Sequence, residues 1–111
     1  MPEIYWGMTL TDDGDIEYKQ EIKAIIKDSK DRNLLVALFL NAKKYMTHRT
    51  EGNRKFADGI QALADFAAPY HVQVAIYPHA NNYCETLAQS VNMARQIDRD
   101  NVGVIFNTCI F

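Results

Sequence analysis

Apolar residues are spaced along the chain in two ways, in short continuous or alternating runs and in longer stretches with helical spacing. The short runs predict four β-strands, at residues 4–10, 34–40, 72–77 and 101–106. The run LLVALFL, at residues 34–40, is apolar at every position, which is typical of a strand covered on both faces. Because such strands usually lie in parallel sheets, the pattern favours a parallel sheet.

Three stretches with helical spacing separate these strands and predict helices. The residues that share one face in each are Tyr18, Ile22, Ile25 and Ile26; Phe56, Ile60, Leu63 and Ala67; and Tyr83, Leu87, Val91 and Ala94. Asp15 is the predicted N-cap of the first helix, and Pro69 follows the end of the second. Asn82 and Glu85 have the spacing of a capping box at the third.

The order β-α-β-α-β-α-β predicts an α/β fold, a parallel sheet of βαβ units with four strands and three helices. No linker or low-complexity segment divides the 111 residues, so we expect one domain over residues 1–111. Two architectures use this order, an open doubly wound sheet and part of a (β/α)8 barrel. In both, binding sites gather at the carboxyl ends of the strands.

Polar residues follow each predicted strand. They are Thr9 and Thr11; Asn41, Lys43 and Lys44; His79, Asn81 and Asn82; and Asn107 and Thr108. His79 lies just beyond the third strand, where a side chain can face a ligand. The other interpretation of His79 is a surface or capping histidine held by local hydrogen bonds.

The charge, the apolar segments and the absent motifs limit the classes of partner that the chain can bind. The net charge of -2, with basic residues scattered among acidic ones, argues against nucleic-acid binding. No apolar segment has the length of a bilayer span, and the first residues lack the layout of a signal peptide, so we expect a soluble cytoplasmic protein without membrane contact. Phosphate-loop, dinucleotide and α/β-hydrolase motifs are absent. Cys84 and Cys109 form no CxxC pair and are interpreted as buried thiols.

The segments VQVAIYPH, ETLAQSVNMARQI and NVGVIFNTCIF, in this order and spacing, resemble the xylose isomerase-like family of sugar phosphate isomerases and epimerases. Its members are (β/α)8 (TIM) barrels. The resemblance covers nearly the whole chain and places its strands as the third to sixth of the barrel. It implies a half-barrel, and an activity in carbohydrate metabolism that isomerises or epimerises a sugar or sugar phosphate.

The resemblance also implies a divalent metal held by two glutamates, an aspartate and a histidine at the ends of the fifth to eighth strands. Here Tyr77 stands at the first glutamate position and Asn107 at the aspartate position, while Ile110 replaces a substrate-binding histidine. A phenol and a carboxamide are poor ligands for a hard cation. We therefore expect no metal site and no cofactor in this chain, which alone should be inactive.

Together, the strand ends and the resemblance give the candidate site. His79 and Tyr77 are the candidate catalytic residues, and Asn41, Lys43 and Asn107 are the candidates for binding a sugar or sugar phosphate. Each has a structural alternative. Tyr77 can pack at the barrel rim with its hydroxyl satisfied, and Asn107 can bond backbone groups in a turn. Lys43, within the basic run of Lys44, His48 and Arg49, can be a solvated loop residue.

Four parallel strands cannot close a barrel, so two edges and much of the interior face would be open. Trp6, Phe39, Ile76 and Phe106 should then be partly exposed, and the chain could form a homodimer through its open sheet edges. Three interpretations follow: a piece of an isomerase-like barrel, a non-catalytic half-barrel module that binds or self-associates, and an open α/β domain that binds a small anion. Strand order separates the third from the others, because barrel neighbours follow the order of the chain.

Overall fold

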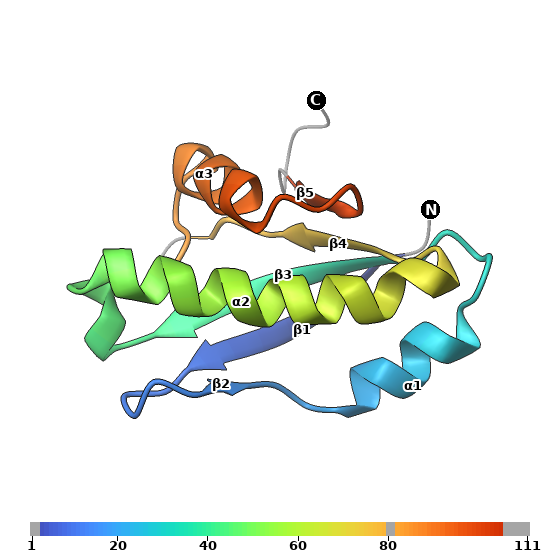
Figure 1. The fold of residues 1–111 in the computed structure, drawn as a ribbon, viewed down its shortest axis with the longest axis horizontal. Coiled ribbons are helices and arrows are strands. Elements are labelled where there is room, and N and C mark those ends of the chain that lie inside the picture. The colour runs from blue at the N-terminus through green and yellow to red at the C-terminus, as the bar shows by residue number, and fades with distance from the viewer. Residues whose placement is uncertain (1–2, 80–81, 106–111) are drawn as a thin grey trace.

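The sheet places its parallel strands in the order of the chain. The computed structural model describes residues 3–79 and 82–105 and contains one five-stranded sheet of order β2-β1-β3-β4-β5 (Figure 1). The parallel strands are β1 (Glu3–Leu10), β3 (Leu35–Ala42), β4 (Gln73–Ile76) and β5 (Val102–Val104). The predicted parallel α/β fold is confirmed, and the strand order is the one expected of a barrel wall.

All three described helices lie on the same side of the sheet. They are α1 (Glu21–Asp28), α2 (Arg49–Ala67) and α3 (Leu87–Ile97), with 3-10 turns η1 (Lys44–Met46) and η2 (Ala68–Tyr70). In Figure 1, α2 crosses in front of the central strands, α3 lies over the β5 side and α1 over the β1 side. A doubly wound sheet carries helices on both faces. One-sided helices therefore fit a partial TIM barrel better.

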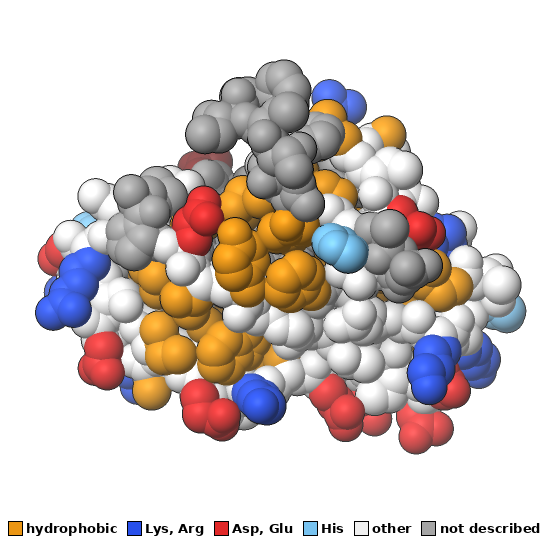
Figure 2. All heavy atoms as spheres, turned by 180° about the vertical axis from the view of Figure 1, so that it is seen from behind, with side chains coloured by type: hydrophobic (Ala, Val, Ile, Leu, Met, Phe, Trp, Pro, Cys, Tyr) orange, Lys and Arg blue, Asp and Glu red, His pale blue; other side chains and the backbone are white. Residues whose placement is uncertain are grey.

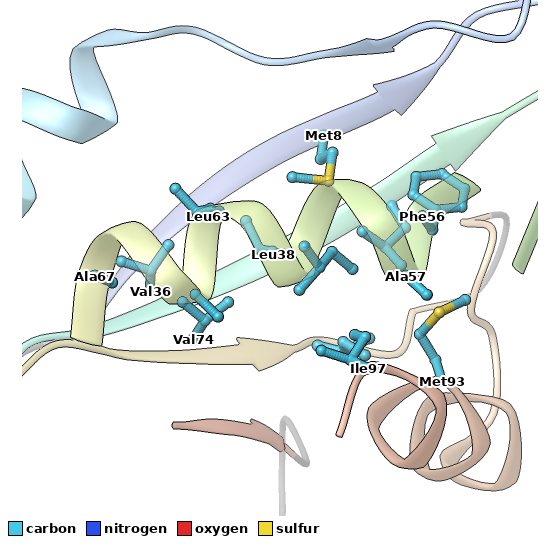
Figure 3. Close-up of a cluster of buried hydrophobic side chains, with 14 of the residues drawn as sticks. Met8, Val36, Leu38, Phe56, Ala57, Leu63, Ala67, Val74, Met93 and Ile97 are labelled. Atoms are coloured by element: carbon cyan, nitrogen blue, oxygen red, sulfur yellow. The ribbon is translucent and has the colours of Figure 1, made fainter. Parts of the chain in front are cut away.

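The hydrophobic core lies between α2 and the sheet (Figure 3). Phe56, Ile60, Leu63 and Ala67 are buried, which confirms the predicted face of the second helix. From the sheet, the core receives Met8, Val36, Leu38, Leu40, Val74 and Ile76. Each fully buried large aliphatic side chain contributes about 1.5–3 kcal/mol relative to an exposed one, so this layer supplies most of the stability.

Successive residues of each strand point alternately to the helices and away from them. Trp6, Leu38 and Ile76 are aligned across three strands on the helix side. The predicted exposure of Ile76 is wrong, because this side chain lies under the helix layer and is fully buried. Trp6 is half-buried, and its indole N–H donates to the backbone carbonyl of Lys19 at 3.0 Å. Phe106 lies outside the described residues.

A short hairpin replaces the predicted start of the first helix. Residues Ile16–Glu17 form β2, antiparallel to the end of β1, and α1 begins only at Glu21. Asp15 is not the N-cap: its backbone carbonyl accepts from the Thr11 N–H at 2.8 Å, and its own N–H donates to Thr11 Oγ1 at 3.1 Å. Gly14, at φ 91°, supplies the left-handed residue that this tight turn requires.

The start of the third helix also differs from the prediction. The capping box is formed by Thr86 and Gln89 instead of Asn82 and Glu85. The predicted apolar face is confirmed only in part: Tyr83 is buried, but before the helix begins, and Ala94 packs against the core, whereas Leu87 is exposed. The buried residues of α3 itself are Ser90, Met93 and Ile97.

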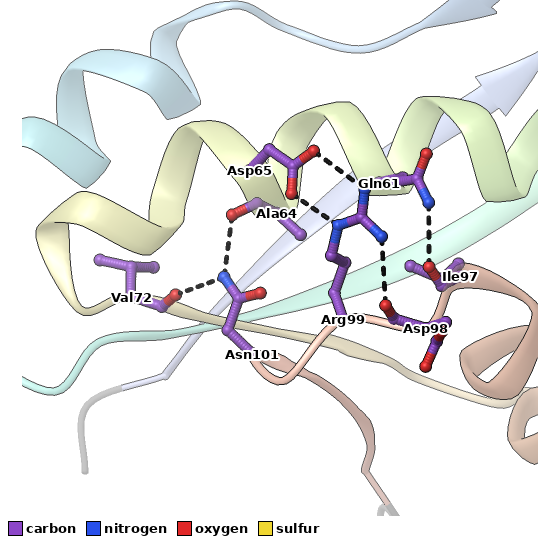
Figure 4. Close-up of polar contacts among 8 residues, drawn as sticks. All are labelled: Gln61, Ala64, Asp65, Val72, Ile97, Asp98, Arg99 and Asn101. Atoms are coloured by element: carbon purple, nitrogen blue, oxygen red, sulfur yellow. Dashed lines mark hydrogen bonds and ion pairs between the residues drawn. The ribbon is translucent and has the colours of Figure 1, made fainter.

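Polar contacts connect α2 to the segment between α3 and β5 (Figure 4). The side-chain amide of Asn101 donates to the carbonyls of Ala64 at 2.9 Å and Val72 at 3.2 Å. On the surface, Arg99 pairs with Asp65 at 2.8 Å. These contacts hold β5 beside β4 although only three residues of β5 form the strand.

Candidate functional site

A hollow of about 460 Å³ lies at the carboxyl ends of β1 and β3. It is lined by Thr9, Leu10, Thr11, Asp12, Asn41, Ala42 and Lys43. Thr9 and Asn41 are aligned on neighbouring strands, so both side chains project from the same face of the sheet. Two predicted substrate-binding residues, Asn41 and Lys43, therefore line the same hollow, and Thr9 on β1 adds a hydroxyl group beside Asn41.

Asp12 lines the same hollow and was missed in the sequence analysis. Its Oδ1 accepts a hydrogen bond from the backbone N–H of Lys44 at 3.2 Å, which ties the turn after β1 to the loop after β3. The sequence signal for Asp12 was its position directly after the strand end and Thr11. Thr9 and Thr11 were named among the strand-end residues, and Asp12, which follows Thr11 directly, can face a ligand in the same way.

Tyr77 follows the last residue of β4 and lies on the face of the sheet turned away from the helices. Its N–H donates to the Leu38 carbonyl at 3.0 Å, which continues the pairing of β4 with β3. The Tyr77 ring centroid is 5.0 Å from that of Phe39 and 5.5 Å from that of Tyr5. The ring therefore belongs to an aromatic cluster (Tyr5, Phe39 and Tyr77) one layer below the strand ends.

His79 is exposed and lies beside this cluster, with its ring centroid 6.2 Å from that of Tyr77. Its backbone is fixed by a turn, because its N–H donates to the Cys84 carbonyl at 3.0 Å and its carbonyl accepts from the Asn82 N–H at 3.1 Å. The two candidate catalytic residues are therefore neighbours. Asn107, the remaining candidate, lies outside the described residues, as do Asn81 and Thr108.

The loop that carries His79 is anchored to α2 through Tyr83. The buried Tyr83 hydroxyl lies 2.7 Å from Asn53 Oδ1 and 3.1 Å from the Arg49 carbonyl oxygen. Arg49 stacks its guanidinium 4.2 Å from the Tyr83 ring centroid and donates to the Tyr83 carbonyl. Burial raises the pKa of the Tyr83 phenol, and the Arg49 charge acts in the opposite direction. Arg49, part of the predicted basic run, is thus a packing residue here.

The family's metal site does not fit the described residues. The position of the strand-five glutamate holds Tyr77, whose ring packs against Tyr5 and Phe39. Within residues 3–79 and 82–105, no three His, Cys, Asp or Glu side chains are grouped so that they could hold a metal ion. A phenol is a poor ligand for a hard cation. Beside Tyr77, desolvation, the charge of Glu3 and the Tyr77 ring raise the pKa of the Tyr5 phenol.

Among the residues that the structure describes, no helix has both the length and the apolar character needed to cross a bilayer.

Searches of curated proteins and of solved structures found no match to the chain. A family model described as "Xylose isomerase-like TIM barrel" matches residues 5–110, nearly all of the chain. With its parallel strands in chain order and its helices on one side, this chain belongs to the xylose isomerase-like TIM barrel family.

Proposed function

We propose that the chain is a sugar phosphate isomerase/epimerase-like half-barrel that binds a sugar or sugar phosphate at its strand ends and lacks the usual metal site. The observation that carries this proposal is the hollow in which Thr9, Asn41 and Lys43 lie together at the ends of two adjacent parallel strands. Ligands of parallel α/β folds bind at this end of the sheet.

The side chains of the hollow suit a polyhydroxylated ligand. The Asn41 amide can donate to one hydroxyl and accept from another, and the Asp12 carboxylate accepts strongly from hydroxyl groups. The Lys43 ammonium adds a charge that favours a phosphate group. Sugar recognition therefore divides between Asn41 and Asp12 for the hydroxyls and Lys43 for the phosphate.

Isomerisation and epimerisation both move a proton near a carbonyl carbon, which needs an acid or a base beside the sugar. In our proposal His79 holds this proton, with Tyr77 beside it as a hydroxyl donor. Tyr77 stands at the position of a carboxylate ligand of the family's metal, but neither Tyr77 nor His79 supplies a carboxylate. The chain by itself should therefore bind its sugar without converting it.

Calorimetry with fructose 6-phosphate, fructose and inorganic phosphate tests the binding site. Asn41→Ala should weaken binding of both sugars about tenfold. Lys43→Ala should weaken binding of fructose 6-phosphate and inorganic phosphate but not that of fructose. His79→Ala should also weaken sugar binding. Lys30→Ala, an exposed lysine just after α1, is the matched control and should change nothing. Unchanged affinities in Asn41→Ala and Lys43→Ala would contradict the proposed site, and an unchanged affinity in His79→Ala would remove that residue from it.

A metal titration tests the second part of the proposal. Calorimetry with Mn²⁺ should show no tight binding, because Tyr77 occupies the place of a carboxylate ligand. A manganese site of submicromolar affinity would contradict this expectation.

A second candidate function is a non-catalytic half-barrel module that self-associates. The observation that favours it is the exposure of aromatic side chains on the face of the sheet that no described helix covers. Tyr5, for example, is 51% exposed.

A further inference from the structure

The face of the sheet turned away from the helices, here called the open face, has an aromatic centre. Ring centroids are 5.6 Å apart between Tyr5 and Phe39, 5.5 Å between Tyr5 and Tyr77, and 5.0 Å between Phe39 and Tyr77. Figure 2 shows hydrophobic side chains gathered on this side of the molecule. Contiguous exposed patches of this kind mark association surfaces.

Two glycines show that space lies open on both sides of this cluster. Gly7 on β1 and Gly103 on β5 are on the open face, because they are aligned with Phe39 and Ala75. A Cβ atom added at either glycine would meet no atom within 4 Å. The described part of the chain therefore leaves the aromatic cluster uncovered.

The open face is large enough for a stable interface. The molecule measures 39 × 31 × 21 Å, and the view down its shortest axis looks onto the sheet and its helices (Figure 1). The open face therefore lies across the two longer dimensions. A standard interface buries about 800 Å² on each partner, which is less than a face of these dimensions offers.

The β1 edge of the sheet lacks a strand partner among the described residues over much of its length. β2 pairs with β1 only at Thr9 and Leu10, so the described structure provides no strand partner for the outer edge of β1 before them. Hollows of about 580 and 320 Å³ lie along this edge, between β1 and the segment around Lys19. A closed (β/α)8 barrel has eight parallel strands, and residues 3–79 and 82–105 contain four parallel strands in sequential order.

We infer that a second copy of this chain covers the open face, so that the parallel strands of two copies enclose the aromatic cluster in one two-fold symmetric dimer. The second copy is the partner whose face matches in size and apolar character, since a two-fold interface uses the same patch on both chains. In such a dimer the strand-end hollows of both copies lie at the borders of the same interface. The inference does not require sugar binding, although Thr9 and Asn41 of the hollow lie on the same open face.

Light scattering of the full chain after size exclusion tests the inference. The chain has a mass of 12.7 kDa, and we expect a discrete species of twice this mass. Tyr5→Arg and Gly7→Arg should each raise the dimer dissociation constant at least tenfold, because they place a charge on the open face. Gly7→Arg adds its side chain where space is open, so it should keep the fold, which circular dichroism checks.

Leu87→Arg is the matched control, since Leu87 is an exposed hydrophobic residue, 40% accessible, on α3 in the helix layer. This variant should remain dimeric. A monomeric wild-type chain would overturn the inference and leave the open face to another partner. A ladder of larger species would overturn the closed dimer, and equal effects of Leu87→Arg and Gly7→Arg would overturn the assignment to the open face.

Discussion

The two faces of the sheet are made from alternate residues of the same strands, yet they differ in cover and in chemistry. On β3, Leu38 and Leu40 point under α2 and are fully buried, whereas Phe39 and Asn41 point to the open face and remain accessible. The covered face contains mainly aliphatic side chains, with Trp6 on β1. The open face contains the rings of Tyr5, Phe39 and Tyr77, the small residues Ala37 and Ala75, and polar residues at its border. The comparison teaches that one face holds the fold while the other is available for binding.

The largest expected difference between the faces concerns adjacent residues of β3. Leu38→Ala should lower the free energy of unfolding by about 2–5 kcal/mol, because it leaves a cavity under α2. Phe39→Ala should cost only about 1 kcal/mol, since water already reaches this ring on the open face. Urea denaturation followed by circular dichroism, at the lowest practical chain concentration, measures both.

That experiment needs a low chain concentration because a second copy that packs on Phe39 would raise the free energy of unfolding of the folded chain. If Phe39→Ala costs as much as Leu38→Ala in dilute solution, the open face is covered within a single chain and the comparison between the faces fails.

Alanine substitutions at two glycines, Gly52 in the helix layer and Gly7 on the open face, compare the two faces with smaller expected changes in the free energy of unfolding. Ala usually stabilises a helix relative to Gly by about 1 kcal/mol, but a Cβ at Gly52 in α2 would lie 2.6 Å from the Tyr83 hydroxyl. Gly52→Ala should therefore lower the free energy of unfolding by about 1–2 kcal/mol. Gly7→Ala, on the open face, should leave it unchanged or raise it by less than about 1 kcal/mol. Thermal and urea unfolding measure both variants, and a stabilised Gly52→Ala would show that Tyr83 moves without cost.

The smallest expected effect is a pH dependence on the covered side. Burial raises the pKa of the Cys84 thiol above its ordinary value, while the nearby Ser90 side chain and the charge of Arg49 act in the opposite direction. The folded chain therefore keeps this proton more firmly than the unfolded chain. Its contribution to stability is complete below the unfolded pKa, near 9, and is lost as the pH rises through the folded value.

Cys84→Ala should reduce this alkaline slope, whatever its effect on stability at neutral pH. Urea unfolding at several pH values from 7 to about 10 measures the slope. Tyr5→Phe removes a phenol on the open face and is the counterpart, with a smaller change expected because solvent screens that group. An equal slope in the wild type and Cys84→Ala would contradict the role of the thiol.

Much of the fold could be predicted from the sequence because strand and helix periods differ strongly. The buried run of β3 and the apolar face of α2 both agree with their spacing, and helices between strands require parallel pairing. The family resemblance then supplied the barrel order. One-sided helices could not be predicted from spacing, because the continuous apolar run at residues 34–40 indicates a strand covered by helices on both faces, whereas the described helices cover one.

The helix starts were predicted less well because several residues could act as caps. Asp15 has the side chain of an N-cap, but its backbone joins a hairpin that Gly14 makes possible. Thr86, and not Asn82, is the N-cap of α3. The loop before it places Tyr83 in its buried position against α2, so the helix starts only after this residue. Such tertiary contacts are not visible in local sequence.

For the site, Asn41 and Lys43 line one hollow because both lie at the end of the same strand, and Thr9 joins them from the neighbouring strand. Tyr77 and His79 are likewise neighbours after β4. The binding and chemical roles of all four predicted residues stay predictions. Asp12 was missed although it directly follows Thr11, which was named among the strand-end residues. Arg49 was grouped with the basic run because sequence does not reveal that its guanidinium packs on Tyr83.

The strict alternation along β3 restricts how this protein can change. Inserting one residue within the strand would exchange its two sets of side chains, turning Leu40 toward water and Asn41 into the core. New ligand preferences can therefore arise by replacing residues such as Asn41 one at a time, whereas changes in length are tolerated only in the loops, such as the one that carries Lys43. In evolutionary terms, the rim can vary in chemistry and the loops in length, while the strand itself must keep its residue count.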